Sequence, residues 1–212
     1  MSDSGTPSNQ QQPLASMPPP EPTPAVADPA PLGLAGFAMT TLVLSVFNAG
    51  LLPETAEPIV FPLALFYGGL AQLFAGMWEF RRANTFGALA FSSYGAFWLS
   101  FWGFETFIAP GLPEPAVAAG LGIYLLAWAI FTAYMSLAAA RVSGAVFGVF
   151  VFLTLTFIAL TIAEFSGVAG WARIGGWLGI ITAVIAWYAS FAGVVNSTWK
   201  RTLIPTWPVH RE

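Results

Sequence analysis

Three carboxylates lie near the ends of long apolar stretches, where ion pairing or proton transfer is the chemistry open to them. Glu79 belongs to MWEFRRANTF, which places a carboxylate, two arginines and a helix-capping asparagine within a few residues. Glu105 lies near the end of a second apolar stretch, and Glu164 directly follows a third. A charge costs less near a helix end than at the centre of a bilayer, so we assign both to an interface. For Glu79 two roles stay open, an ion pair with the arginines and a proton relay.

Uncharged polar side chains inside the apolar stretches form a second group. Serine and threonine often bond to their own helix, whereas Asn48 and Gln72 are costlier to bury and indicate a hydrated route. Together they predict a sparsely polar path lined by Thr40, Thr41, Asn48, Gln72, Asn84, Thr85, Ser93 and Thr154. No lysine or arginine falls inside an apolar stretch. Such a path suits a neutral solute or a weak monocarboxylate better than phosphate.

The residues needed for enzyme chemistry are missing from the apolar stretches. The chain has no cysteine, and its one histidine, His210, stands third from the end. Thiolate nucleophiles, disulfides and cysteine metal sites are therefore excluded, and so is histidine catalysis within a membrane. We expect no enzyme activity, no metal site, no cofactor and no nucleic-acid partner. A sensor or an assembly scaffold remains an alternative class.

The composition indicates that lipid surrounds most of the chain. Of 212 residues, 57% are apolar and 8% are charged, against about 25% charged in soluble domains. A helix needs ~20 apolar residues to span a bilayer. We predict an all-α integral membrane domain over residues 28–199 with six transmembrane helices, at 32–52, 58–78, 85–109, 115–139, 143–163 and 175–196.

The chain ends differ from this domain. Residues 1–27 are rich in proline, serine and glutamine, which predicts a disordered tail and not a signal peptide. Residues 200–212 form a short C-terminal tail. Six basic residues fall on one side of the predicted bundle, and Arg173 alone on the other; the six are Arg81, Arg82, Arg141, Lys200, Arg201 and Arg211. The positive-inside rule then places both termini in the cytoplasm of a multi-pass cell-membrane protein.

The first predicted helix follows the stretch DPAPLGL. Proline fits the first helical turn, so Pro29 and Pro31 set the helix start and leave free N–H groups around residues 32–34. A helix N-terminus can hold a carboxylate without a cationic side chain. Two interpretations stay open, an anion-binding turn and a plain helix start.

Three motifs, in order, resemble the acetate uptake transporter family, which includes bacterial succinate–acetate permeases. DPAPLGL resembles the family's NPAPLGL, residues 66–98 resemble its longest shared block, and RTLIP at 201–205 resembles its RTxLP ending. The resemblance covers residues 28–208. It implies a ring-shaped homohexamer in the lipid bilayer, with one path in each six-helix protomer. The substrate-binding motif would be Asp28, Pro29, Ala30, Pro31, Leu32, Gly33 and Leu34.

The resemblance also implies the cargo and the narrowest point of the path. The cargo would be acetate or a related short monocarboxylate, and by extension succinate, coupled to protons; a passive acetate channel is the alternative. The constriction would consist of Phe37, Tyr94 and Leu155, and the family's glutamate would be Glu79. Counted from the predicted helix starts, the three constriction residues lie at about 8, 14 and 18 Å, so they share a level only if the boundaries shift by a turn.

The sequence departs from the family pattern at two positions. Asp28 replaces an asparagine and places a carboxylate beside the path, although aspartate caps a helix as well as asparagine does. Ala83 replaces the glycine of GNTF. We expect the first change to weaken binding of an acetate anion by charge repulsion, and the second to constrain the backbone before the third helix.

Overall fold

The computed structural model describes residues 26–209, so the predicted disorder of residues 1–27 falls almost wholly outside them, as do residues 210–212. The regular secondary structure of the described chain is helical, apart from one isolated bridge between Ser143 and Pro208. Its α-helices are α1 (Ala30–Asn48), α2 (Val60–Leu65), α3 (Gln72–Arg81), α4 (Thr85–Gly103), α5 (Glu114–Ala139), α6 (Gly144–Ser166) and α7 (Ala169–Trp199). Shorter elements are the 3₁₀ turns η1 (Glu54–Ile59) and η4 (Ala109–Gly111) and the π-helices η2 (Phe66–Ala71) and η3 (Phe104–Ile108).

Five helices of the described chain are long and apolar enough to cross a membrane. They are α1, the continuous run Glu54–Arg81, α5, α6 and α7. Helix α4 has 19 residues, but its serine, glycine, tyrosine and tryptophan residues lower its hydropathy, and it is not among the five.

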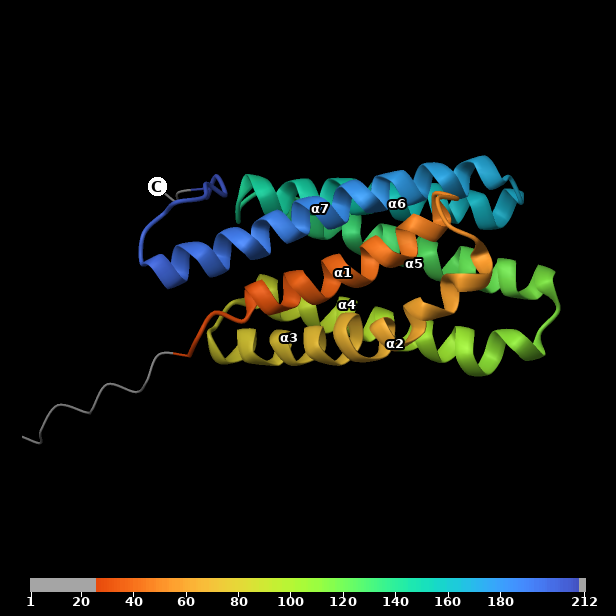
Figure 1. The fold of residues 1–212 in the computed structure, drawn as a ribbon, viewed down its shortest axis with the longest axis horizontal. Helices are drawn as coiled ribbons and strands as arrows, with labels where there is room; N and C mark the ends of the chain where they lie inside the picture. The colour runs from red at the N-terminus through yellow and green to blue at the C-terminus, as the bar shows by residue number, and fades with distance from the viewer. Residues whose placement is uncertain (1–25, 210–212) are drawn as a thin grey trace, which may run out of the picture.

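The helices run along the long axis of the molecule, with α1 between α6 and α7 on one side and α3 and α4 on the other (Figure 1). Helix α1 packs along α7 and also contacts η2 and α3, while α6 packs against both α5 and α7. The described chain begins and ends at the same end of the bundle (Figure 1). We call this the basic end, because three basic residues lie in the connections there. Arg82 follows α3, Arg141 lies between α5 and α6, and Lys200 follows α7.

Small residues bring α1 and α7 into backbone contact. A Cβ added at Gly176 would lie 2.2 Å from the backbone nitrogen of Ala49, and one added at Gly179 would lie 2.1 Å from Ser45 Oγ. Glycine is therefore required at both positions, as in other close helix crossings in membranes. Gly148 of α6 differs, since its nearest neighbour would be 3.7 Å away.

Helices α1 and α7 have boundaries that differ from those predicted, and α4 ends at Gly103, after which the predicted span to residue 109 continues as η3 and η4. Helix α1 ends at Asn48 instead of residue 52, because Gly50 adopts a left-handed φ of 72° that stops the helix. Helix α7 begins at Ala169, six residues before the predicted 175, and so includes Arg173. The predicted helix over 58–78 also contains the π-helix η2, an irregularity that often marks a functional position.

Candidate functional site

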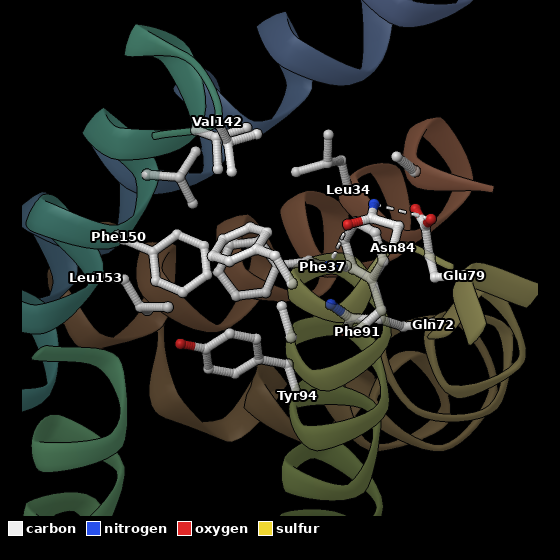
Figure 2. A pocket seen from close by; sticks show the side chains of 16 residues that line it. Leu34, Phe37, Gln72, Glu79, Asn84, Phe91, Tyr94, Val142, Phe150 and Leu153 are labelled. Carbon is white, nitrogen blue, oxygen red and sulfur yellow. Dashed lines mark hydrogen bonds between the residues drawn. The ribbon is translucent and has the colours of Figure 1, made fainter. Parts of the chain in front are cut away.

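Two cavities lie one after the other inside the bundle and share Phe37 and Leu153 as lining residues. The first cavity lies toward the basic end, and its lining includes Leu34, Phe37, Gln72, Glu79, Asn84, Tyr94, Phe150 and Leu153 (Figure 2). The second cavity lies toward the opposite end, which we call the acidic end. Its lining includes Phe37, Thr41, Asn48, Glu57, Trp98, Glu105, Leu153 and Glu164.

The junction between the cavities is made of closely packed apolar side chains. Phe37, Tyr94 and Leu153 are 4%, 3% and 3% exposed. The Phe37 and Tyr94 rings lie 5.8 Å apart, centroid to centroid, and Tyr94 and Phe150 lie 5.9 Å apart. The Tyr94 hydroxyl is hydrogen bonded to that of Thr132 on α5, at 2.9 Å, which fixes the ring across the junction. A solute crossing here would lose most of its water.

The leucine at the junction is Leu153, and the predicted Leu155 is wrong in position. Two residues turn an α-helix by about 200°. Leu155 therefore faces away from the bundle and is 44% exposed, whereas Leu153 lines both cavities.

This correction removes the predicted mismatch in level. Phe37, Tyr94 and Leu153 follow the first residues of α1, α4 and α6 by seven, nine and nine positions. At 1.5 Å per residue these are depths of about 11, 14 and 14 Å. All three helices start at the basic end (Figure 1). The three residues therefore lie at nearly the same depth.

Buried polar atoms without a partner gather along the cavities. Gln72 Oε1 and Glu79 Oε1 belong to the first cavity, and Thr41 Oγ1 and Trp98 Nε1 to the second; none has a hydrogen-bond partner within residues 26–209. Leaving such a group unpaired costs about 1–3 kcal/mol. Water or a bound solute in the cavities would remove this cost.

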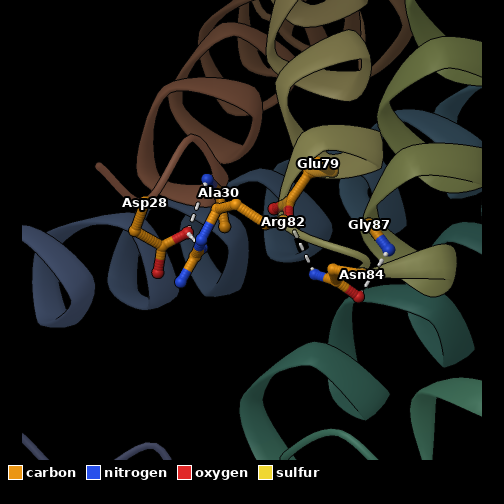
Figure 3. A network of polar contacts seen from close by, with 6 residues as sticks. All are labelled: Asp28, Ala30, Glu79, Arg82, Asn84 and Gly87. Carbon is orange, nitrogen blue, oxygen red and sulfur yellow. Dashed lines mark hydrogen bonds and ion pairs between the residues drawn. The ribbon is translucent and has the colours of Figure 1, made fainter. Parts of the chain in front are cut away.

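Glu79 is held by Asn84. The Asn84 side chain donates from Nδ2 to Glu79 Oε2 at 2.9 Å and accepts the backbone N–H of Gly87 at 3.2 Å, as the cap of α4 (Figure 3). The predicted asparagine cap is therefore confirmed. Glu79 is fully buried and forms no ion pair within the described chain. The sequence left two roles open for Glu79, and the ion pair with an arginine is not formed. The proton relay stays a prediction.

The N-terminus of α1 already holds a carboxylate of the chain itself. Asp28 accepts the backbone N–H of Ala30 at 3.1 Å and forms an ion pair with Arg82 (Figure 3). Both side chains are partly exposed. Asp28 therefore occupies the Ala30 N–H in the first turn of α1, where the sequence predicted that a substrate carboxylate could bind.

Within the predicted substrate-binding motif, only Ala30 and Leu34 line a cavity; Asp28, Pro29, Pro31, Leu32 and Gly33 do not. Pro31 contributes its carbonyl to a hydrogen bond from Ser190, at 2.7 Å, and Gly33 lies against the ring of Phe91. These residues fasten α1 to its neighbours.

Half of the predicted polar lining residues face the cavities. Gln72 and Asn84 line the first, and Thr41 and Asn48 line the second. The other four line neither cavity, and the reasons are local. Thr40 and Thr154 donate to carbonyls of their own helices, at Gly36 and Phe150. Thr85 is exposed at the start of α4, and Ser93 is partly buried outside both linings.

Glu57 is a lining residue that the sequence reasoning did not single out. It lies in η1, the short segment after α1, with Glu105 and Glu164 around the same cavity. The available signal was its position beside the predicted helix start at residue 58, at the same end of the bundle as the other two carboxylates.

Comparison with known proteins identifies the family of the chain. The chain matches the model of the GPR1/FUN34/yaaH family over residues 10–211. It is 38% identical, over 87% of its length and 97% of the relative, to a succinate-acetate/proton symporter, SatP, of Escherichia coli K12. It is 46% identical to ammonia transport outward protein 2 of Saccharomyces cerevisiae, over 84% of its own length and 64% of that protein's.

A solved structure of the bacterial acetate channel SatP superimposes with a TM-score of 0.80 at 38% identity, covering 86% of this chain and 99% of that one. The helices long enough to cross a membrane and this likeness make the chain a multi-pass membrane protein. Because the family model spans nearly the whole chain, and relatives of 38% and 46% identity accompany it, the protein belongs to the GPR1/FUN34/yaaH family.

Proposed function

We propose that this protein carries acetate and related short monocarboxylates, with succinate as a further cargo, across the cell membrane. The observation that carries the proposal is the pair of cavities that meet at Phe37 and Leu153, with unpartnered polar atoms on both sides of an apolar junction. Relatives named as a succinate-acetate/proton symporter and an acetate channel support it. On the same grounds we place the chain among transport proteins and not among enzymes.

The membrane arrangement that we propose has six spans, with α4 as the sixth and both termini in the cytoplasm. Helix α4 contributes Tyr94 to the junction and packs along α3, so it must lie at the same depth as the other helices. An even number of spans is supported because residues 26–209 begin and end at the same end of the bundle (Figure 1). The basic residues at that end support a cytoplasmic position.

We also propose a homohexamer, in which each protomer keeps its own path. Large apolar side chains such as Phe66, Phe74 and Leu137 are 63%, 58% and 78% exposed on the single chain. Lipid and neighbouring protomers would cover such surfaces. Native mass spectrometry in detergent tests the stoichiometry, and a monomer as the largest folded species would refute it.

The chemistry of the junction favours a weak acid that can lose its charge. Within the described chain, neither cavity has a lysine or arginine in its lining, so an anion would find no cationic partner there. At pH 7 a carboxyl group with a pKa near 4.3 is un-ionised ~0.2% of the time. We propose that a proton accompanies the substrate through the junction, with Glu79 as a candidate relay next to Gln72 in the first cavity.

Labelled acetate uptake into proteoliposomes tests the function, with empty liposomes measured in parallel to subtract diffusion through lipid. Accumulation above the outside concentration under an inward proton gradient, abolished by an uncoupler, would mean that a proton moves with acetate. Equilibration at one rate with and without the gradient would mean an anion channel. Flux of methylammonium without flux of acetate would instead align the protein with the yeast relative's name.

Glu79→Gln tests the relay separately. The amide keeps the shape of the side chain and the contact with Asn84 but cannot exchange a proton. A wild-type rate at every pH would remove Glu79 from the mechanism. Glu114→Gln is the matched control, because Glu114 is exposed at the start of α5 and lines neither cavity.

A further inference from the structure

The second cavity is ringed by three carboxylates from three different elements. Glu57 comes from η1, Glu105 from η3 and Glu164 from α6, and each is half-buried. Glu105 lies close enough to both of the others for their charges to interact. The described lining includes no lysine, arginine or histidine. This end of the cavity is therefore a concentration of like charge without an internal counterion.

Few other charges reach this group. Glu54, on the same segment as Glu57, adds a further negative charge. Arg173 approaches Gly50 at the same end but does not line the cavity and is exposed. Within residues 26–209, no three acidic or histidine side chains are grouped closely enough to hold a metal ion. The cluster of carboxylates is thus not explained as a metal site. A carboxylate anion that entered the cavity here would be repelled.

Thr41 gives the cavity a second feature that points to a ligand. Its side chain is 5% exposed and lines the cavity, and Thr41 Oγ1 has no hydrogen-bond partner in the described chain. Ser45 and Asn48 line the same cavity one and two turns further along α1, toward the carboxylates. Residues spaced by three and four lie on one face of a helix, so these groups form a polar stripe leading inward.

The two features together fit an un-ionised carboxylic acid. Such an acid offers one O–H donor and one carbonyl acceptor, whereas its anion offers acceptors only. The Thr41 hydroxyl can donate to the carbonyl, and the glutamates can accept from the acid O–H. The anion could use Thr41 but would face the three carboxylates with nothing to donate.

We propose that the second cavity admits short monocarboxylic acids in their un-ionised form, and that Glu57, Glu105 and Glu164 determine this preference. The proposal rests on the proposed transport function and refines it. It implies that the proton is selected together with the substrate at the acidic end, before the junction is reached. Transport would then be electroneutral.

The test is the pH dependence of protein-dependent acetate flux in proteoliposomes, at a fixed total acetate concentration well below saturation. Between pH 7 and pH 6 the un-ionised fraction rises about tenfold, from ~0.2% to ~2%. We expect the wild-type rate to rise about tenfold as well. In the triple variant Glu57→Gln, Glu105→Gln, Glu164→Gln, the anion gains access, and the rise should fall below about threefold. The control Glu114→Gln should keep the tenfold rise.

Membrane potential provides a second measurement. A potassium diffusion potential is set with valinomycin. It should leave wild-type flux unchanged, because the un-ionised acid carries no charge, and it should alter flux through the triple variant, because the acetate anion responds to voltage. If the triple variant does not reconstitute, Glu105→Gln alone should give a smaller shift in the same direction, since Glu105 interacts with both other carboxylates.

The outcomes separate this inference from the transport function itself. Acetate flux with the same pH ratio and the same voltage independence in wild type and variants would overturn the role of the carboxylates and leave transport standing. Inhibition of wild-type acetate flux by ammonium, but not of flux through the triple variant, would make the cavity a cation site and also overturn the inference. Absence of protein-dependent acetate flux in the wild type would refute the transport function.

Discussion

Replacing Leu153 by alanine should widen the junction and let longer acids pass. The side chain is 3% exposed and lines both cavities, so its loss enlarges the aperture between Phe37 and Tyr94. An apolar pocket discriminates by about 1–3 kcal/mol per methylene. Butyrate is two methylenes longer than acetate. Because alanine opens only the α6 side, we count one methylene and take ~1.4 kcal/mol from that range, which is a tenfold change.

We therefore expect the ratio of butyrate to acetate flux to rise about tenfold or more in Leu153→Ala, measured in proteoliposomes after subtraction of empty vesicles. Leu155→Ala is the matched control, because the same atoms are removed from a side chain that is 44% exposed and faces away from the bundle. Its flux ratio should equal that of the wild type. An unchanged ratio in Leu153→Ala, or a raised ratio in Leu155→Ala, would refute the assignment of the junction.

Three further predictions concern the elements that position the site. Ala83 has a φ of 57°, so Ala83→Gly should raise the free energy of unfolding by about 1 kcal/mol, seen as a higher melting temperature in detergent. A Cβ at Gly76 would lie 2.5 Å from a backbone nitrogen of α4, so Gly76→Ala should cost about 1–3 kcal/mol, while Gly148→Ala, with 3.7 Å of space, should be nearly neutral. Asp28→Asn should keep the turn at the start of α1 and lower the free energy of unfolding by less than about 1 kcal/mol, because the ion pair with Arg82 is partly exposed to solvent. Urea unfolding of the variant should also depend less on salt concentration than that of the wild type.

The helical architecture could be predicted from sequence because hydropathy reports burial in lipid directly. Four of the six predicted spans coincide closely with helices: α5, α6, the run ending in α3, and α4 with its continuation η3. Two of the errors came from backbone conformation. The end of α1 depends on the left-handed Gly50, and the π-helix η2 leaves no mark on hydropathy. The start of α7 was placed too late because a charged residue, Arg173, lies in its second turn.

The candidate site was harder to predict because it depends on rotation about each helix. Phe37 and Tyr94 followed from motifs with fixed spacing, and both lie at the junction. The resemblance assigned the constriction leucine to Leu155, whereas the leucine that lines both cavities is Leu153, two residues earlier and about half a turn away. The polar residues pose the same problem, since Thr40 and Thr41 are adjacent in sequence and only Thr41 reaches a cavity. Composition identifies such residues, and tertiary packing selects among them.

The names of the two bacterial comparisons, a proton symporter and a channel, are compatible if the path accepts only the un-ionised acid. Each acid molecule carries one proton, so a passive path of this kind has a fixed one-to-one stoichiometry without any conformational cycle. At equilibrium the un-ionised acid is equal on both sides, and total acetate then differs tenfold for each unit of pH difference. Accumulation that collapses with an uncoupler would be observed for this path as for a symporter. What distinguishes a path for the acid from a path for the anion is voltage, and the carboxylates Glu57, Glu105 and Glu164 are the residues on which that difference depends.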